Sequence, residues 1–173
     1  MSTKNIPIEF LHECFEYNPE TGILTWKERP LSHFASYRGF GMWNKRYPNQ
    51  PVGTLNRGYL QTRLHIEGNR FTTVNVHRIC YALAIGEWPK GEIDHINGIH
   101  DDNRICNLRD ATRSENQNNP NNKLRKDNKS KYRGVYWSKQ YKKWIACLRR
   151  ECLGMFDTPE GASKAYLDAH NRK

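Results

Sequence analysis

The sequence predicts an α+β protein in which short strands, hairpins and helices form two domains. Residues 58–66 alternate between apolar and polar side chains, and a Glu-Gly-Asn turn leads into a second extended run at 70–76, which predicts a β-hairpin. Thr112 and Glu115 have the spacing of a capping box, which predicts a helix that begins after short extended segments. Residues 120–130 contain almost no apolar side chains and mark the boundary between the domains.

Composition limits the class of protein. The chain has 173 residues, of which 36% are hydrophobic, so it has room for one medium domain or two small ones. It contains no run of about 18 apolar residues, and its N-terminus lacks the apolar segment of a signal peptide. We therefore expect no membrane association and a cytoplasmic location.

Positive charge is concentrated in the C-terminal third. The net charge is +10; residues 121–173 hold 14 Lys and Arg against 5 Asp and Glu, whereas residues 1–120 hold 14 against 13. This distribution predicts that the C-terminal third binds a polyanion, with a solvated basic tail as the alternative.

The five cysteines are scattered and never form a Cys-x-x-Cys pair. This spacing argues against a disulfide framework and against a structural zinc site. We expect free thiols, mostly buried, at Cys14, Cys80, Cys106, Cys147 and Cys152.

The N-terminal region combines a helix, a strand and an aromatic stretch. Apolar side chains at helical spacing predict a helix over 7–16, and the turn sequence at 18–22 precedes a strand at 23–27. Residues 29–51 have three prolines and are expected to be irregular. The aromatic side chains of this stretch should pack on the domain, with contact to DNA as the alternative.

The hairpin has one apolar and one polar face. Leu60, Thr62, Leu64 and Ile66 alternate with Tyr59, Gln61, Arg63 and His65. The polar face, including Arg63, either reads a DNA groove or is solvated.

A helix should follow the hairpin. Asn75 is expected to cap it. His77 and Arg78 are expected to lie off its apolar stripe, which consists of Val76, Ile79, Cys80, Leu83 and Ala84.

The most informative stretch is 92–117. A strand should end near His95, because Asn97-Gly98 favours a turn. A second extended segment at 107–111 then precedes the capped helix, which cannot run far past Asn119 because Pro120 follows.

This pattern resembles the HNH (ββα-metal) nucleases, and within them the branch of phage proteins and intron-encoded homing endonucleases. The ordered set over 26 residues is specific, whereas an isolated Asp-His pair beside a turn is usually a solvated loop or a cap. The matching residues are Asp94-His95, the Asn-Gly-x-x-x-Asp-Asn loop at 97–103, Asn107-Leu-Arg109, and Ala-Thr-x-x-Glu-Asn at 111–116.

The resemblance implies a role for each of these residues. His95 would be the general base, and Asn107 would brace the loop that orients it. Asp94 and Asn116 would hold one Mg²⁺ or Mn²⁺ ion, which suits their hard oxygen atoms. One geometric difficulty follows, since neighbouring strand residues such as Asp94 and His95 point to opposite faces.

Other residues near this motif have two interpretations each. His77 and Arg78 match the Val-His-Arg of this branch and would contact a phosphate, although His77 fits a structural role equally well. Arg109 would contact a phosphate or pair with a loop carboxylate. His100, Asp101, Asp102 and Asn103 are expected to shape the loop rather than bind the metal.

Residues 131–173 predict a three-stranded antiparallel sheet packed on one helix. The strands are expected at 132–137, 143–149 and 152–156, and Asp157-Thr-Pro-Glu160 should begin the helix. This pattern resembles the APETALA-type DNA-binding domain, by which Arg133, Trp144 and Arg149 would contact DNA. The chain departs from the plant pattern at Tyr136, where an arginine is usual.

The expected organisation is therefore a hairpin region and nuclease module at 1–119 (catalytic core 76–119), a basic linker at 120–130 that tracks the DNA backbone, and an APETALA-type domain at 131–173. The expected function is a site-specific homing endonuclease that acts on double-stranded DNA as a monomer, nicks one strand and needs no small-molecule cofactor. One alternative is a DNA-binding regulator with an idle nuclease core, and a weaker one is an RNA-directed nuclease.

Overall fold

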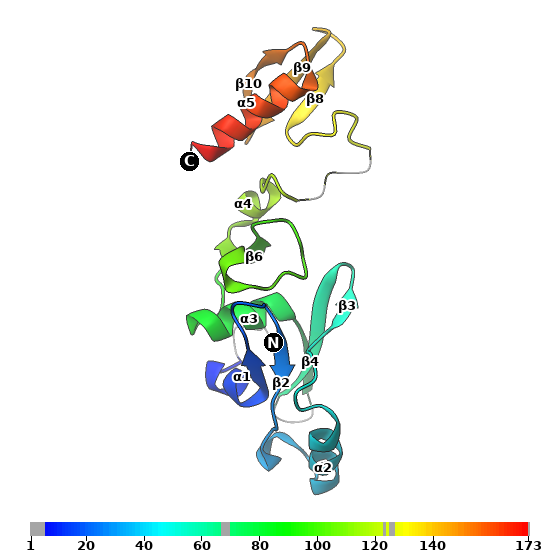
Figure 1. The fold of residues 1–173 in the computed structure, drawn as a ribbon, viewed down its shortest axis with the longest axis vertical. Coiled ribbons are helices and arrows are strands. Elements are labelled where there is room, and N and C mark those ends of the chain that lie inside the picture. The colour runs from blue at the N-terminus through cyan, green and yellow to red at the C-terminus, as the bar shows by residue number, and fades with distance from the viewer. Residues whose placement is uncertain (1–5, 67–69, 123, 125–126, 173) are drawn as a thin grey trace. The chain divides into compact units, whose positions relative to one another are not determined.

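The computed structural model describes residues 6–66, 70–122, 124 and 127–172. The chain divides into two compact units, residues 1–116 and residues 117–173 (Figure 1). The first unit contains the stretch that resembles a nuclease. The predicted turn at 67–69 and part of the predicted linker lie outside the described residues.

The N-terminal unit begins with a helix and a small hairpin. Helix α1 (Ile8–Cys14) leads directly into β1 (Phe15–Tyr17), which pairs antiparallel with β2 (Leu24–Trp26). The predicted helix was too long at its C-terminal end, because Phe15 already has extended backbone geometry. The predicted turn at 18–22 is confirmed by a hydrogen bond from the Gly22 amide to the Asn18 carbonyl oxygen at 2.9 Å.

Residues 29–51 are not irregular, so that expectation was wrong. They contain a 3₁₀ turn, η2 (Leu31–His33), and a ten-residue helix, α2 (Tyr37–Arg46). Ser36 caps α2 by accepting a hydrogen bond from the Gly39 amide at 3.1 Å. The expected packing of the aromatic side chains is confirmed, since the ring centroid of Trp43 lies 5.0 Å from that of Trp26.

A three-stranded antiparallel sheet follows in the order β3 (Thr54–Asn56), β4 (Tyr59–Ile66) and β5 (Arg70–Asn75). The predicted hairpin is confirmed as β4 and β5, with Thr62 opposite Val74. Thr62, Leu64 and Val74 are buried, so one face of the sheet belongs to the core.

Helix α3 (Val76–Ile85) is packed on this sheet and ends at Gly86, which has a φ of 84°. The expected capping by Asn75 was wrong, because its side chain makes no cap hydrogen bond and instead accepts one from Gln61 Nε2 at 2.9 Å. The buried face of α3 also differs from the predicted stripe. It includes Ala82 rather than Ala84, and it includes His77.

The core of this unit is shared by elements from most of its length. It joins side chains from α1, the β1–β2 hairpin, the β3–β5 sheet and α3 with Ile93 and Leu108, which belong to the stretch that resembles a nuclease. That stretch is therefore supported by elements that precede it in the chain.

The C-terminal unit has the predicted composition of three strands and one helix. Its antiparallel sheet has the order β10 (Glu151–Phe156), β9 (Lys143–Leu148) and β8 (Val135–Ser138), and α5 (Pro159–Asn171) packs on it. Thr158 caps α5 by accepting a hydrogen bond from the Gly161 amide. A small core forms around Val135, Ala146 and Ala162.

All five cysteines are free thiols, but the expectation that most are buried was wrong. Cys14 and Cys80 are buried, Cys147 is half-buried, and Cys106 and Cys152 are exposed. In the part of the chain that is described, no helix combines the length and the apolar character needed to cross a membrane.

Candidate active site

Two short strands and a helix form the framework of the candidate site. Strand β6 (Glu92–His95) pairs antiparallel with β7 (Leu108–Ala111), which η3 (Ile105–Asn107) precedes and α4 (Arg113–Gln117) follows. The capping box is confirmed: Glu115 Oε2 accepts from the Thr112 amide at 2.8 Å, and Thr112 Oγ1 accepts from the Glu115 amide at 3.2 Å. The predicted order of strand, loop, strand and helix is observed.

Asn107 ties down the loop between the strands. Its Oδ1 accepts a hydrogen bond from the Asn97 amide at 2.9 Å, and its Nδ2 donates to the Asp102 carbonyl oxygen at 2.8 Å. Gly98 has a φ of 73°, and its amide donates to the His95 carbonyl oxygen at 2.8 Å, so the chain turns immediately after β6. The buried Asn107 side chain thus joins the end of the loop to its start and to its middle.

An ion pair at the surface of the loop stabilises it further. Arg104 Nη2 donates to Asp102 Oδ2 at 2.6 Å, and Arg104 Nε donates to Asp102 Oδ1 at 2.8 Å. These hydrogen bonds lower the pKa of Asp102 to about 2. Asp102 therefore stays ionised at neutral pH. Its hydrogen bonds stabilise the loop, as expected from its position.

His95 lies at the end of β6 and is almost completely buried, with 2% of its surface exposed. Its Nε2 lies 3.2 Å from Asn103 Oδ1, and its ring meets the ring of His77 edge-on at a centroid distance of 5.1 Å. Burial is the main cause that lowers the pKa of His95, and the hydrogen bond to Asn103 opposes it. The imidazole is therefore neutral at neutral pH, which is the form that accepts a proton.

Tyr59 connects this histidine to the β3–β5 sheet. Its ring stacks on His100 at a centroid distance of 4.3 Å and lies 6.3 Å from the ring of His95. It also meets the ring of His77 at 5.4 Å. Tyr59 was not among the predicted site residues, because only the fold brings strand β4 next to the loop.

His77 lies inside this cluster rather than on the surface. It is 5% exposed, and burial, followed by the nearby charges of His95, Arg78 and His100, lowers its pKa to about 3. Of the two interpretations left open by the sequence, the geometry favours a structural neighbour of His95 over a phosphate contact.

The burial of His77 predicts a pH-dependent stability. In an unfolded chain the imidazole of His77 has a pKa of about 6.5. Below that pH the unfolded state therefore binds a proton at His77, whereas the folded state does not. The free energy of unfolding should therefore decrease as the pH is lowered. We expect His77 to contribute about 2 kcal/mol of this decrease between about pH 7 and about pH 5. Urea unfolding of His77→Gln at both values should show a smaller fall. His12→Gln, which replaces an exposed histidine, should show the same decrease in unfolding free energy as the unaltered protein. If His77→Gln also shows that full decrease, His77 is not its source.

Asp94 is the most deeply buried carboxylate of the candidate site, at 1% exposure. Its Oδ2 accepts hydrogen bonds from Arg109 Nε at 2.8 Å and from Arg109 Nη2 at 2.6 Å. The two residues lie directly opposite each other on β6 and β7. Arg109 therefore pairs with a carboxylate, although this carboxylate belongs to the strand rather than to the loop.

Asn116 reaches the same face of β6 as Asp94. Its Nδ2 donates to Glu92 Oε2 at 2.8 Å, and side chains two residues apart on a strand point to the same side. Glu92 and Asn116 are thus placed on the Asp94 face, whereas His95 alternates to the other. Glu92 was not among the predicted site residues, although its spacing of two residues from Asp94 in a short strand was the available signal.

Comparison with known protein families assigns this segment. Residues 74–118 match the HNH endonuclease family. The matched residues include α3, β6, β7 and α4, and they make up an HNH endonuclease domain, which supports a nuclease function and a DNA substrate. The chain matches no curated protein and no solved structure.

Arg78 has an internal role within the HNH domain. Its Nη1 donates to the Gly91 carbonyl oxygen at 2.9 Å and its Nη2 to the Pro89 carbonyl oxygen at 3.2 Å. These bonds fix the connection between α3 and β6. A phosphate contact by Arg78 would have to coexist with them.

The other predicted DNA contacts lie outside the HNH domain. Arg63 on β4 and Arg149 in the β9–β10 turn are exposed. Arg133 donates from Nη1 to the Gln117 carbonyl oxygen at 2.6 Å and from Nη2 to the Asn122 carbonyl oxygen at 3.1 Å, so it holds the start of the C-terminal unit. Trp144 is half-buried against Trp137, with ring centroids 5.2 Å apart.

Proposed function

We propose that this protein is a metal-dependent, site-specific DNA endonuclease of the homing type, with His95 as its general base. The HNH match over residues 74–118 is the observation that carries this proposal. It covers the segment that positions a buried, neutral imidazole at the end of β6. The product ends would be a 5′-phosphate and a 3′-hydroxyl.

The hydrogen bond to Asn103 defines the form of His95 that would react. An amide oxygen accepts a hydrogen bond, so His95 Nε2 carries the proton and Nδ1 carries the lone pair. Nδ1 would take a proton from a water molecule as the water oxygen attacks phosphorus and the bond from phosphorus to the 3′-oxygen breaks, and the 3′-oxygen would take a proton from bulk water. Asn107 would act indirectly, because it fixes the loop that carries Asn103.

The oxygen atoms of Asp94 and Asn116 fit a hard divalent cation such as Mg²⁺ or Mn²⁺. Because Nδ2 of Asn116 donates to Glu92, Oδ1 is the atom of that amide that can bind a cation. Among the described residues, no group of three or more His, Cys, Asp and Glu side chains is arranged to hold a metal. A cation bound by Asp94 and Asn116 would leave positions for water and a DNA phosphate, and it would stabilise the charge on the phosphate and on the leaving oxygen.

Arg109→Ala tests Asp94 as a ligand without measuring activity. The substitution leaves the buried Asp94 carboxylate without its guanidinium partner, and we expect the free energy of unfolding in EDTA to fall by about 3 kcal/mol. Mg²⁺ or Mn²⁺ should stabilise Arg109→Ala more than it stabilises the unaltered protein, as measured by thermal unfolding. Arg113→Ala, an exposed change on α4, is the matched control. Equal metal effects in all three proteins would argue against Asp94 as a ligand.

Asp94 and His95 alternate to opposite faces of β6, so they can act on one phosphate only near the end of the strand. The turn at Gly98 provides such an end. A substrate that wraps around this strand end would contact both residues. His77 and Arg78 would then support the site from α3 rather than bind a phosphate themselves.

We propose the C-terminal unit as the part that reads the DNA sequence, in the manner of an APETALA-type domain. Its three-stranded sheet packed on α5 and its basic composition support this assignment. Arg149, which is exposed beside β9, and Trp144, which is half-buried on β9, would contact DNA, and Arg133 would have to exchange its present carbonyl partners. The segment at 120–130 would follow the DNA backbone between the two domains.

Cleavage of a plasmid library tests the proposal. Supercoiled plasmids with random inserts are incubated with the protein in Mg²⁺, Mn²⁺ or EDTA, and the ends are sequenced. We expect metal-dependent nicking of one strand at a restricted set of inserts, because each monomer carries one catalytic site. DNA binding without a cut in any insert would instead support a non-cleaving regulator, an alternative that the pairing of Asp94 with Arg109 favours.

A further inference from the structure

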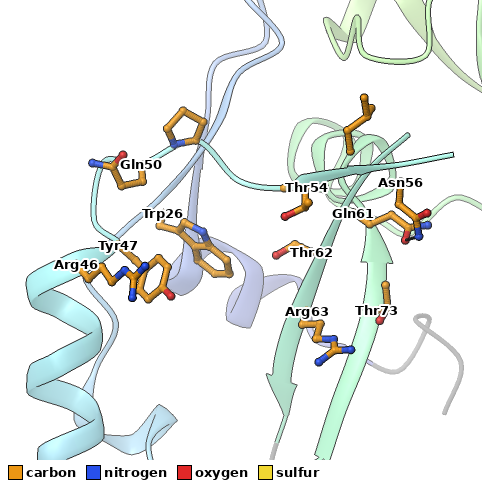
Figure 2. Close-up of a pocket in the computed structure, with 13 residues that line it drawn as sticks. Trp26, Arg46, Tyr47, Gln50, Thr54, Asn56, Gln61, Thr62, Arg63 and Thr73 are labelled. Carbon is orange, nitrogen blue, oxygen red and sulfur yellow. Dashed lines mark hydrogen bonds between the residues drawn. The ribbon is translucent and has the colours of Figure 1, made fainter. Parts of the chain in front are cut away.

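A groove runs between α2 and the β3–β5 sheet, outside the HNH domain. It has a volume of about 890 Å³. Figure 2 shows Trp26, Arg46 and Tyr47 on its helix side and Thr62 and Arg63 on its sheet side. A smaller hollow of about 400 Å³ adjoins it and shares Trp26, Tyr47 and Arg63.

The groove and the hollow are cationic. Arg46 and Arg63 are exposed and line the groove, and the described lining of both spaces contains no aspartate or glutamate. Arg29 lines the hollow and is 5% exposed; its Nε donates to His33 Nδ1 at 3.2 Å, whereas its buried Nη2 has no hydrogen-bond partner within the described ranges. No carboxylate that the structure describes forms an ion pair with this guanidinium, and a buried charge without a counter-ion favours an anionic ligand.

The aromatic walls are already packed by protein side chains. The Trp26 ring lies 4.6 Å from that of Phe15 and meets the Trp43 ring edge-on at 5.0 Å. The Tyr47 ring lies 5.0 Å from the Trp43 ring and under the Arg46 guanidinium at 5.4 Å. Rings held in this way favour a phosphate in the groove over a nucleobase stacked on an open ring face.

The sheet links the groove to the active site. One face of β4 carries Tyr59, Gln61 and Arg63, because side chains two residues apart on a strand point to the same side. Thr73 of β5 lies opposite Arg63 and belongs to the same face. Tyr59 contacts the histidine cluster, and Arg63 lines the groove. At a rise of about 3.3 Å per residue, Arg63 lies about 13 Å along the strand from Tyr59, which equals about four base pairs of duplex.

We propose that this groove binds the phosphodiester backbone of duplex DNA within about four base pairs of the bond that the HNH domain cuts. The proposal rests on the proposed function, since that supplies the DNA. Arg46 and Arg63 contact two phosphates. The polar side chains of Gln61, Thr62 and Thr73, which also line the groove, lie along the same DNA strand. The groove thus positions the duplex while the site at His95 cuts it.

Salt dependence of binding measures these contacts directly. The double variant Arg46→Gln/Arg63→Gln is compared with the unaltered chain on a labelled 40-base-pair duplex in EDTA, by fluorescence anisotropy at several KCl concentrations. Loss of two phosphate contacts should reduce the slope of log K against log salt by about 1.8. Arg38→Gln is the matched control, because Arg38 is an exposed arginine of α2 outside the groove.

A slope in the double variant equal to that of Arg38→Gln would overturn the proposal. A loss confined to a single-stranded 40-mer would also overturn it, in favour of single-strand binding. A third measurement locates the contact on the DNA. Neutral methylphosphonates that replace the phosphates near the mapped cut should weaken binding by the unaltered chain but not by the double variant. If the unaltered chain binds duplex DNA through the groove but never cuts it, the proposed nuclease function and the stated distance to a cut both fail, while the backbone contact of Arg46 and Arg63 stands.

Discussion

His95→Ala should cut DNA about 10² to 10⁴ times more slowly than the unaltered protein, while its affinity for the duplex stays the same. The imidazole is neutral and buried at the end of β6, and Asn103 fixes which nitrogen carries the proton. Alanine removes the proton acceptor and leaves the proposed cation ligands Asp94 and Asn116 in place. Single-turnover cleavage of a labelled duplex measures the chemical step separately from product release.

Two comparisons make this result specific. His12→Ala removes an exposed histidine of α1 and should cut at the normal rate. Added imidazole should restore part of the activity of His95→Ala, because it can occupy the space left by the ring and accept the proton. If His95→Ala cuts as fast as the unaltered protein, His95 is not the base.

Gly22→Ala should lower the free energy of unfolding of the N-terminal unit by about 3 kcal/mol or more. Gly22 has a φ of 74°, and an added Cβ would lie 2.5 Å from the Arg104 amide nitrogen and 2.7 Å from the Asn103 carbonyl carbon. The backbone of the active-site loop would have to move. Cleavage should therefore fall together with stability, because Asn103 contacts His95.

Two other glycines separate the causes of this effect. Gly86→Ala introduces a side chain at a similar φ of 84° with no atom within 4 Å, so it should cost only about 1 kcal/mol. Gly41→Ala lies in α2 with open space around it and should be neutral or stabilising by about 0.5 to 1 kcal/mol. Urea unfolding of the three variants gives the comparison. If Gly22→Ala lowers the free energy of unfolding no more than Gly86→Ala does, the backbone at Asn103 and Arg104 can move away from the added Cβ without a large energetic cost.

The elements that the sequence predicts well depend on local interactions. The β4–β5 hairpin follows from alternation, the start of α4 from reciprocal hydrogen bonds between Thr112 and Glu115, and the turn after His95 from the positive φ of Gly98. In each case the residues that decide the structure lie within a few positions of one another.

The elements that the sequence does not predict depend on tertiary packing. Helix α2 contains Gly39 and Gly41, which lower its intrinsic helix propensity, yet Trp43 secures it against Trp26 from a distant strand. The burial of His77 follows from the contact of α3 with Tyr59 and His95, which alternation and helical period do not reveal. Long-range contacts of this kind require the fold itself.

The candidate site divides in the same way. Family resemblance placed His95, Asp94, Asn107 and Asn116 in one motif, and the bracing contacts of Asn107 are visible in the loop. The pairing of Asp94 with Arg109 depends on the register of β6 and β7, so the sequence left it open. Glu92 was missed because its partner Asn116 lies 24 residues away, on α4.

The shared core has a practical consequence for protein engineering. The HNH match begins at residue 74, yet Ile93 and Leu108 belong to the same apolar cluster as Leu11 and Phe15, and the Tyr17 hydroxyl donates to the Asn103 carbonyl oxygen at 2.7 Å. A fragment cut at the limits of the family match would expose that cluster to water and lose its anchor on the loop. We therefore expect that a transplanted nuclease module needs the earlier elements of the N-terminal unit as well as the matched residues, and that a chimera should be joined after residue 118 rather than begun at Val74.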